Sequence, residues 1–217
     1  MELKHRKVAV MGDSITEGVG TSGPDALYHA ILAKKHGWDL YVDGISGTRI
    51  TPQRTPSATP SFDKDFLSRI KDIPTDAEIV VFFGGTNDFG HGDAPFGQWG
   101  DTTPETFCGA CRCLMQGLIE HNPHAVYVIM TPLHRCTEEM FLTEQKVKEG
   151  NVLSDYVDII RRTAEYMALP VLDLFKMSGL QPRIPVVQET YVPDGLHPND
   201  AGQQVIADRL EGFLLSL

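Results

Sequence analysis

The stretch 7–18, Lys-Val-Ala-Val-Met-Gly-Asp-Ser-Ile-Thr-Glu-Gly, constrains the fold more than any other part of the chain. Its apolar run, Lys7–Met11, ends abruptly in Gly12, Asp13 and Ser14, and a helix-compatible segment follows. A buried parallel strand delivers a side chain in this way to its carboxyl end, where open α/β sheets bind their ligands. Because Ser14 would face the start of the next helix, it can be a nucleophile whose own N–H points at the reacting atom. Gly-Asp-Ser turns also occur in many ordinary loops, so the rest of the chain must decide.

Short apolar strands alternate with amphipathic helical stretches along the whole chain, which is the α/β pattern. We predict five strands, at 7–11, 40–42, 78–83, 125–130 and 171–174. The predicted helices are at 24–35, 62–70, 104–120, 151–167 and 201–215. The long connections at 45–61, 84–103, 131–150 and 175–193 are predicted to be loops. One parallel sheet with helices on both faces follows, joined by right-handed crossovers, and residues 1–217 are predicted to form a single domain.

Composition excludes several classes of partner. The 217 residues are 41% hydrophobic and 22% charged, as in a globular protein with one sizeable core. A net charge of −10 argues against nucleic acid, because phosphate binding needs basic clusters. No apolar stretch reaches membrane-spanning length, and the first strand begins too close to Met1 to leave room for a signal peptide. We therefore expect a cytoplasmic protein with a small-molecule partner and neither a nucleic-acid nor a membrane partner; its oligomeric state stays open.

Four cysteines leave two interpretations. Cys108, Cys111 and Cys113 lie close together, as in some metal clusters, and Cys136 stands apart. However, a helix would turn the first three thiols to different faces, and no second Cys pair or nearby His completes a zinc set. Buried, reduced thiols in a helix are the favoured interpretation.

Four polar stretches should meet at the carboxyl edge of the predicted sheet. They follow the first three strands and precede the last helix, at 12–14, 45–48, 84–88 and 194–198. Together they hold the groups that acyl transfer needs: Ser14 as nucleophile, His197 as general base and Asp194 to orient the imidazole. A turn through Gly195 can fold the Asp194 carboxylate back onto the ring.

The same stretches supply donors for a developing oxyanion. The N–H of Gly47, the side-chain amide of Asn87 and the N–H of Ser14 would converge on it. Each feature also has an ordinary explanation, since Asn87 and Asp88 can form a turn that binds its own backbone, and Gly47 can be a plain positive-φ residue. His197 followed by Pro198 can simply be a helix start.

Two other function classes use the same residues. The side chains of Asp13, Asn87, Asp88, Asp194 and His197 are potential ligands of a two-metal phosphoesterase. Against that class, only one His lies near these motifs, and the sequence has no Asp-x-His or His-x-His pair. A silent binding module on the same fold is the third possibility, although such a module has no need to keep Ser, His and Asp.

With these motifs in view, the chain resembles the SGNH hydrolases of the GDSL esterase/lipase family. Gly12–Thr16 is similar to the family's first block, whose serine is the nucleophile, and Gly47 matches the glycine of the second. Gly85–Asp88 matches the third block's Gly-x-Asn-Asp, and Asp194–Pro198 resembles the block that supplies the acid and base. The resemblance implies a flavodoxin-like, three-layer fold with strand order 2-1-3-4-5, and ester hydrolysis without a metal or other cofactor.

One position departs from the family pattern. The second block commonly begins with Asn, where this chain has Asp43. Because of that difference, a hydrogen bond that shapes the loop in other family members is uncertain here. The oxyanion donor Gly47 is not affected. Asp13 and Asp88, inside the matching blocks, are expected to shape the site.

The substrate is less well defined. Relatives remove acetyl or other short acyl groups from sugars, or act on lipids or thioesters. The long loops that should rim the site carry candidate substrate-binding side chains, namely Arg49, Arg54, His91, Trp99, His134, Arg135 and Tyr191. Arginine with aromatic residues suits a polar, sugar-like or carboxylate-bearing substrate, although each side chain can equally serve loop packing. We expect a short-acyl, chiefly acetyl, ester of a polar or carbohydrate-like small molecule.

Overall fold

A five-stranded parallel sheet forms the centre of the molecule. The computed structural model describes residues 1–141 and 143–217. The strands are β1 (Lys7–Gly12), β2 (Asp39–Gly44), β3 (Ile79–Phe83), β4 (Val126–Met130) and β5 (Val171–Leu172). Their order in the sheet is β2-β1-β3-β4-β5, and every neighbouring pair is parallel. The predicted α/β fold and strand order are therefore confirmed.

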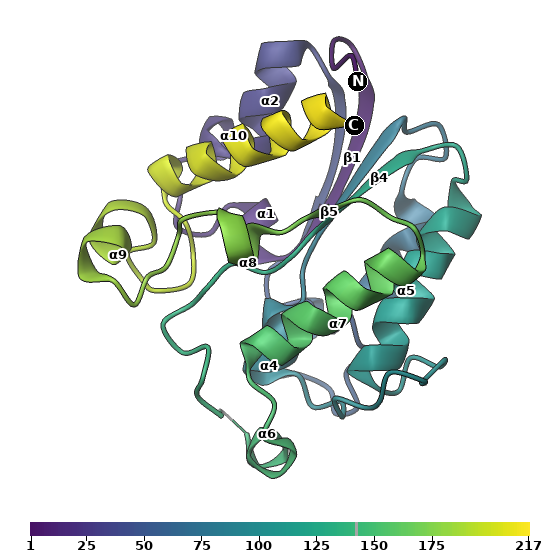
Figure 1. Cartoon of the computed structure of the whole chain (residues 1–217), viewed down its shortest axis with the longest axis vertical. Helices are drawn as coiled ribbons and strands as arrows, with labels where there is room; N and C mark the ends of the chain where they lie inside the picture. The colour runs from purple at the N-terminus through teal and green to yellow at the C-terminus, as the bar shows by residue number, and fades with distance from the viewer. Residues whose placement is uncertain (142) are drawn as a thin grey trace.

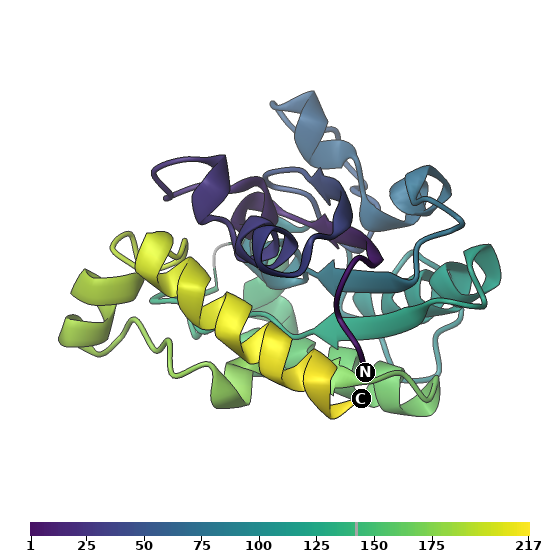
Figure 2. The same cartoon turned by 90° about the horizontal axis from the view of Figure 1, so that it is seen from above.

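Helices cover both faces of this sheet (Figures 1 and 2). On one face lie α2 (Tyr28–His36) and α10 (Asp200–Ser216), and on the other α3 (Phe66–Arg69), α5 (Phe107–His121) and α7 (Leu153–Tyr166).

The central strand β3 is apolar at every position because both of its faces are buried. Ile79, Val81 and Phe83 belong to the core on the α2 and α10 face, whereas Val80 and Phe82 belong to the core on the α5 and α7 face. Each fully buried side chain of this kind contributes about 1.5–3 kcal/mol to the free energy of unfolding. The strand is thus held from both sides, and it carries the next loop to a fixed place.

Short helices occupy segments that the sequence predicts as loops. They are α4 (Thr86–His91), α6 (Glu144–Glu149), α8 (Leu174–Met177) and α9 (Pro185–Tyr191). Helices of four to seven residues are too short to show a hydrophobic period; side-chain caps mark only α6 and α8, and a proline at the first position marks α9. The Asp173 carboxylate accepts from the Lys176 N–H and so starts α8, which ends β5 two residues before the predicted end.

Two predicted helices are broken into shorter elements. The helix expected over 24–35 is a 3₁₀ turn, Pro24–Ala26, followed by α2, because Leu27 between them is extended. The helix expected over 62–70 is divided into a 3₁₀ turn, Pro60–Asp63, α3, and a second 3₁₀ turn, Ile70–Asp72.

The turn after β1 places Ser14 at the first residue of α1 (Ser14–Glu17). Here the backbone of Gly12 approaches the helix so closely that a Cβ would lie 1.9 Å from Thr16 Oγ1. The Asp13 carboxylate caps α1 by accepting from the Ile15 N–H at 3.1 Å, and Gly18, with φ of +106°, ends the helix. The glycines and the cap together fix the serine at the carboxyl edge of the sheet.

Cys108, Cys111 and Cys113 lie on α5 as free thiols, and burial raises the pKa of Cys108 to about 11. Within 1–141 and 143–217, no three His, Cys, Asp or Glu side chains gather as metal ligands would. Over the same residues, no helix combines the length and apolar character needed to cross a membrane.

Candidate active site

Ser14, His197 and Asp194 form one hydrogen-bonded chain at the carboxyl edge of the sheet. His197 Nε2 lies 3.0 Å from Ser14 Oγ, and His197 Nδ1 lies 2.6 Å from Asp194 Oδ2. The other carboxylate oxygen, Oδ1, accepts from the N–H of Leu196 at 2.8 Å and of His197 at 2.6 Å. Gly195, with φ of +79°, makes the tight turn that brings acid and imidazole together over three residues. The candidate nucleophile, base and orienting acid are thus within hydrogen-bonding reach of one another.

Two carboxyl groups near the serine differ in their electrostatics. Partial burial opposes ionisation of Asp194, yet hydrogen bonds from His197 and Leu196 hold the pKa of its carboxyl below the usual range. It is therefore ionised at neutral pH, and it can hold the imidazole in place through its contact with Nδ1. Burial instead raises the pKa of Asp13 to about 6, against the effect of its bond from Ile15 N–H. Asp13 acts as the cap of α1, not as a partner of the imidazole.

Three donors face the same region as the serine hydroxyl. Among the described residues, the backbone N–H groups of Ser14 and Gly47 have no hydrogen-bond acceptor. Asn87 Nδ2 gives one of its hydrogens to the carbonyl oxygen of Thr48 at 2.9 Å, which leaves the other available. Since all three residues line one pocket, the arrangement can stabilise a tetrahedral oxyanion on a carbon attacked by Ser14.

Asp88 joins the loop after β3 to the loop after β2. Its two carboxylate oxygens accept from the N–H groups of Ile50 and Thr51, each at 2.9 Å, and burial raises its pKa. The side chain thus holds the loop that carries Gly47 beside α4.

Asp43, the departure from the family pattern, has an ionic partner. Its Oδ2 lies 3.0 Å from Arg69 Nη1, and Arg69 Nη2 donates to Gly12 O at 3.3 Å and to Thr48 Oγ1 at 3.1 Å. An ion pair thus shapes the loop at this position.

The pocket around these groups has a volume of 290 Å³. Its lining residues are Ser14, Val19, Ser46, Gly47, Phe62, Asn87, Gly90, His91, Arg135, Leu196 and His197. A larger hollow of 440 Å³ lies at the opposite edge of the sheet, around Arg6, Glu78 and Asn122. We assign the site to the smaller pocket because it alone of the two contains the serine and the imidazole.

The whole site falls within a match to a known family. The model of the GDSL-like lipase/acylhydrolase family matches residues 10–205, which include all four motif blocks. The chain belongs to this family.

Solved structures agree with that assignment. A protein from Lactobacillus plantarum is 33% identical, with 98% of each chain covered and a TM-score of 0.81. A protein from Bacteroides ovatus described as a GDSL-like lipase is 16% identical, covering 99% of this chain and 100% of that one, with a TM-score of 0.68. An acetyl xylan esterase is 22% identical, covering 95% and 98%, with a TM-score of 0.64. The last two likenesses concern the fold alone. The chain matches no protein of curated function.

Of the substrate-binding candidates named from the sequence, the structure brings Arg135 and His91 into the pocket of this GDSL-like family member. Arg49 is buried, and its guanidinium donates to Asp63 Oδ1 at 2.8 Å and to Phe62 O at 2.9 Å, so it serves the loop instead. Arg54 is exposed and lies outside the pocket lining.

The other three candidates also lie outside that lining. The ring centroids of His134 and Phe175 are 3.7 Å apart with the planes tilted by 30°, and His134 Nδ1 contacts Glu138 at 2.7 Å. Trp99 packs edge-on against Tyr166, and Tyr191 packs against the core beneath α10.

Sequence reasoning missed Val19, Phe62 and Leu196, which form the apolar part of the pocket wall. Leu196 could have been predicted from the sequence, because it lies between Asp194 and His197 in the same motif. Phe62 had no local signal, since it reaches the site only through the path of the long loop. Its ring lies where a side chain of Gly47 would be, 2.4 Å from a Cβ built there.

Proposed function

We propose that this chain is a serine esterase that hydrolyses short-acyl, chiefly acetyl, esters of a polar or carbohydrate-like small molecule. The observation that carries the proposal is the chain of contacts from Ser14 Oγ to His197, at 3.0 Å, and on to Asp194, at 2.6 Å. Family membership supports the same reaction class.

In the first half of the reaction, His197 Nε2 takes the proton of Ser14 Oγ as the oxygen attacks the ester carbonyl carbon. The carbonyl π electrons move to the oxygen, which the donors of Ser14, Gly47 and Asn87 stabilise. The bond to the alcohol then breaks, and the imidazolium returns its proton to the departing oxygen. Water repeats the steps on the acyl-enzyme, releasing the acid and restoring Ser14.

The preference for short acyl groups rests on the pocket and on two structural neighbours. The 290 Å³ cavity, with Val19, Phe62 and Leu196 as its apolar walls, offers a short apolar surface beside Ser14 that suits a small acyl group. One neighbour is the acetyl xylan esterase, and another, 18% identical, is described as a two-domain esterase active on acetylated mannans. The chain covers 49% of that second protein. A series of para-nitrophenyl esters tests the preference; kcat/KM is expected to peak at acetate or propionate, and a peak at octanoate would contradict it.

A fluorophosphonate separates the function classes. We expect one adduct per chain on the peptide that contains Ser14, none in Ser14→Ala, and full activity after prolonged EDTA treatment. A two-metal phosphoesterase would lose activity with the chelator and take no stoichiometric label. A binding module would show neither label nor turnover. Absence of label in folded protein would overturn the esterase proposal.

A further inference from the structure

Three arginines are buried, and they differ in how their charge is balanced. Arg49 pairs with Asp63 at 2.8 Å, and Arg69 pairs with Asp43 at 3.0 Å. Arg135 is only 9% exposed, yet among residues 1–141 and 143–217 no carboxylate forms an ion pair with it. A buried charge without a counter-ion is costly, so its presence needs a reason.

The protein holds the Arg135 guanidinium with neutral groups. Arg135 Nε donates to Thr137 Oγ1 at 2.9 Å, and Nη1 donates to Thr86 O at 3.3 Å. The Phe89 ring lies 5.7 Å from the guanidinium carbon. With a further bond from Nη1 to Thr86 Oγ1 at 3.4 Å, these contacts use three of the five N–H donors and leave Nη2 without a protein acceptor among the described residues. Burial lowers the pKa of Arg135, and the charges of Asp13 and Asp194 only partly oppose that effect.

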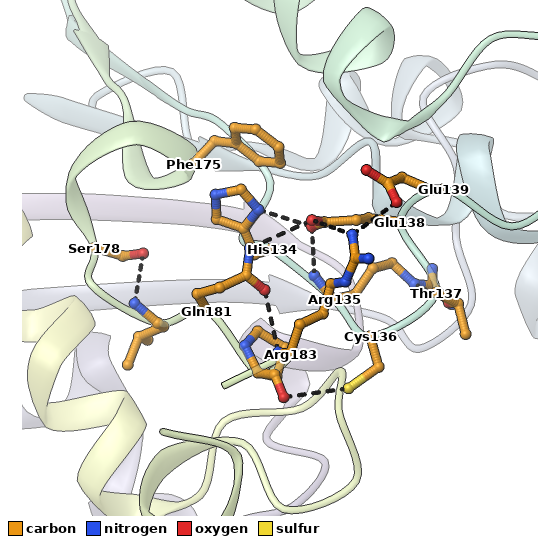
Figure 3. Close-up of polar contacts among 12 residues, drawn as sticks. His134, Arg135, Cys136, Thr137, Glu138, Glu139, Phe175, Ser178, Gln181 and Arg183 are labelled. Carbon is orange, nitrogen blue, oxygen red and sulfur yellow. Dashed lines mark hydrogen bonds and ion pairs between the residues drawn. The ribbon is translucent and has the colours of Figure 1, made fainter. Parts of the chain in front are cut away.

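The loop that carries Arg135 is tied down through Glu138 (Figure 3). The Glu138 carboxylate accepts from the Arg135 backbone N–H at 3.2 Å, from His134 at 2.7 Å and from Gln181 at 3.3 Å. Arg183 adds an ion pair to the neighbouring Glu139 at 2.8 Å. Segments on both sides of β5 thus hold the backbone of Arg135 in place, although the carboxylates reach only its N–H and not its guanidinium.

The unpaired guanidinium lines the pocket that contains Ser14 and His197. Gly90 makes room for it, because a Cβ at that position would lie 2.8 Å from Arg135 Nη1. The absence of a side chain at Gly90 on α4 therefore leaves the space that the Arg135 guanidinium occupies.

A neutral donor lies on the same pocket wall. His91 Nδ1 is 2.9 Å from Arg49 Nη1, which can only donate, so Nδ1 accepts and the ring proton is on Nε2. His91 is an exposed residue, but its ring is partly enclosed; this enclosure and the charge of Arg49 lower its pKa, which keeps the ring neutral at physiological pH.

We propose that Arg135, with the Nε2–H of His91, binds a carboxylate of the substrate, so that the preferred substrates are esters carrying a carboxylate close to the scissile bond. A guanidinium offers two parallel donors that match the two oxygens of a carboxylate. The incoming anion supplies the counter-ion that the protein does not. This inference rests on the proposed esterase function and adds the charge of its substrate.

Two pairs of matched esters test the inference and locate the anion. With the charge on the acyl side, para-nitrophenyl hydrogen glutarate is compared with para-nitrophenyl methyl glutarate. With the charge on the alcohol side, meta-acetoxybenzoate is compared with its methyl ester. We expect the anionic member of at least one pair to have a kcat/KM about tenfold or more higher, as a charge-assisted hydrogen bond would give.

Variants then assign the preference to Arg135. Arg135→Gln is expected to reduce the anion-to-neutral ratio by about 10- to 100-fold, and Arg135→Lys by less, because a lysine keeps the charge but not the paired donors. Gly90→Ala, which displaces the guanidinium without removing it, should also lower the ratio. Arg209→Gln is the matched control: it removes one exposed positive charge on α10, outside the pocket lining, and should leave the ratio unchanged.

The outcomes are distinct. A wild-type enzyme that favours the neutral ester in both pairs overturns the inference, as does an Arg135→Gln variant whose ratio is unchanged. A variant that loses activity equally on both members, with a lower melting temperature, would show a structural role for Arg135 instead. In each of these results ester hydrolysis itself persists, so the proposed function stands. If no ester is turned over and Ser14 takes no fluorophosphonate, both proposals fail.

Discussion

Asn87 and Thr48 join the loops that follow β3 and β2, through a hydrogen bond of 2.9 Å from Asn87 Nδ2 to Thr48 O. The bond fixes the amide plane beside Gly47 and so aims its second hydrogen. The Asn87 side chain therefore has a structural role and a proposed chemical role. Loss of the first would lower stability, whereas loss of the second would lower kcat.

Asn87→Ala should lower kcat by about 100-fold or more and change KM little, because the donor acts most strongly on the charged transition state. Its melting temperature should fall modestly through loss of the bond to Thr48. Asn122→Ala is the control, since buried Asn122 donates to Ala77 O at 2.8 Å at the opposite edge of the sheet. The control should lose stability and keep its kcat. Equal kcat losses in the two variants would contradict the role of Asn87.

Asp13 should make stability fall as pH rises. Its folded-state pKa of about 6 exceeds the unfolded value of 3.8, so the unfolded chain loses this proton first. The free energy of unfolding therefore decreases between about pH 4 and pH 6 and then stays lower by about 3 kcal/mol from this group. Asp13→Asn should remove that dependence, because its Oδ1 can still accept from Ile15 N–H. Urea unfolding at several pH values measures both proteins; parallel curves would refute the prediction.

Gly47→Ala should reduce kcat more than about tenfold by displacing an oxyanion donor. The new Cβ would lie 2.4 Å from the Phe62 ring, in addition to the cost of φ at +73°. Gly179→Ala separates the two effects, because Gly179 has φ of +80° and no atom within 4 Å of a Cβ. That control should lose about 1–2 kcal/mol of stability without loss of kcat. Adding Phe62→Ala to Gly47→Ala should restore part of the activity if the clash with the ring displaces the donor.

The sheet and the positions of the proposed reacting groups could be predicted because their signals are local. β3 is buried on both faces and therefore apolar at every position, and Ser14, Asn87 and His197 each stand directly beside a strand end or helix start. The tight turn through Gly195 is likewise visible in four consecutive residues.

The rim of the site could not be predicted in the same way. Arg49 was expected to face the substrate, but Asp63 and the carbonyl of Phe62 engage it across thirteen or fourteen residues of loop. Arg135 was predicted to bind substrate on the same grounds as Arg49. Only the contacts of the folded chain show that no carboxylate among the described residues forms an ion pair with the Arg135 guanidinium. Which distant group comes to lie beside a long side chain depends on the path of the loops, and no periodic pattern encodes that path.

Ser14 and His197 are 183 residues apart along the chain, although their side chains are in contact. The proposed nucleophile is therefore synthesised long before its base, which emerges from the ribosome just before α10. Until that last helix docks beside α2, the growing chain has a serine hydroxyl with no group to take its proton. We expect ester hydrolysis to begin only once α10 has been made and has packed against α2, so that a shorter chain, however far its sheet has formed, does not hydrolyse the esters around it.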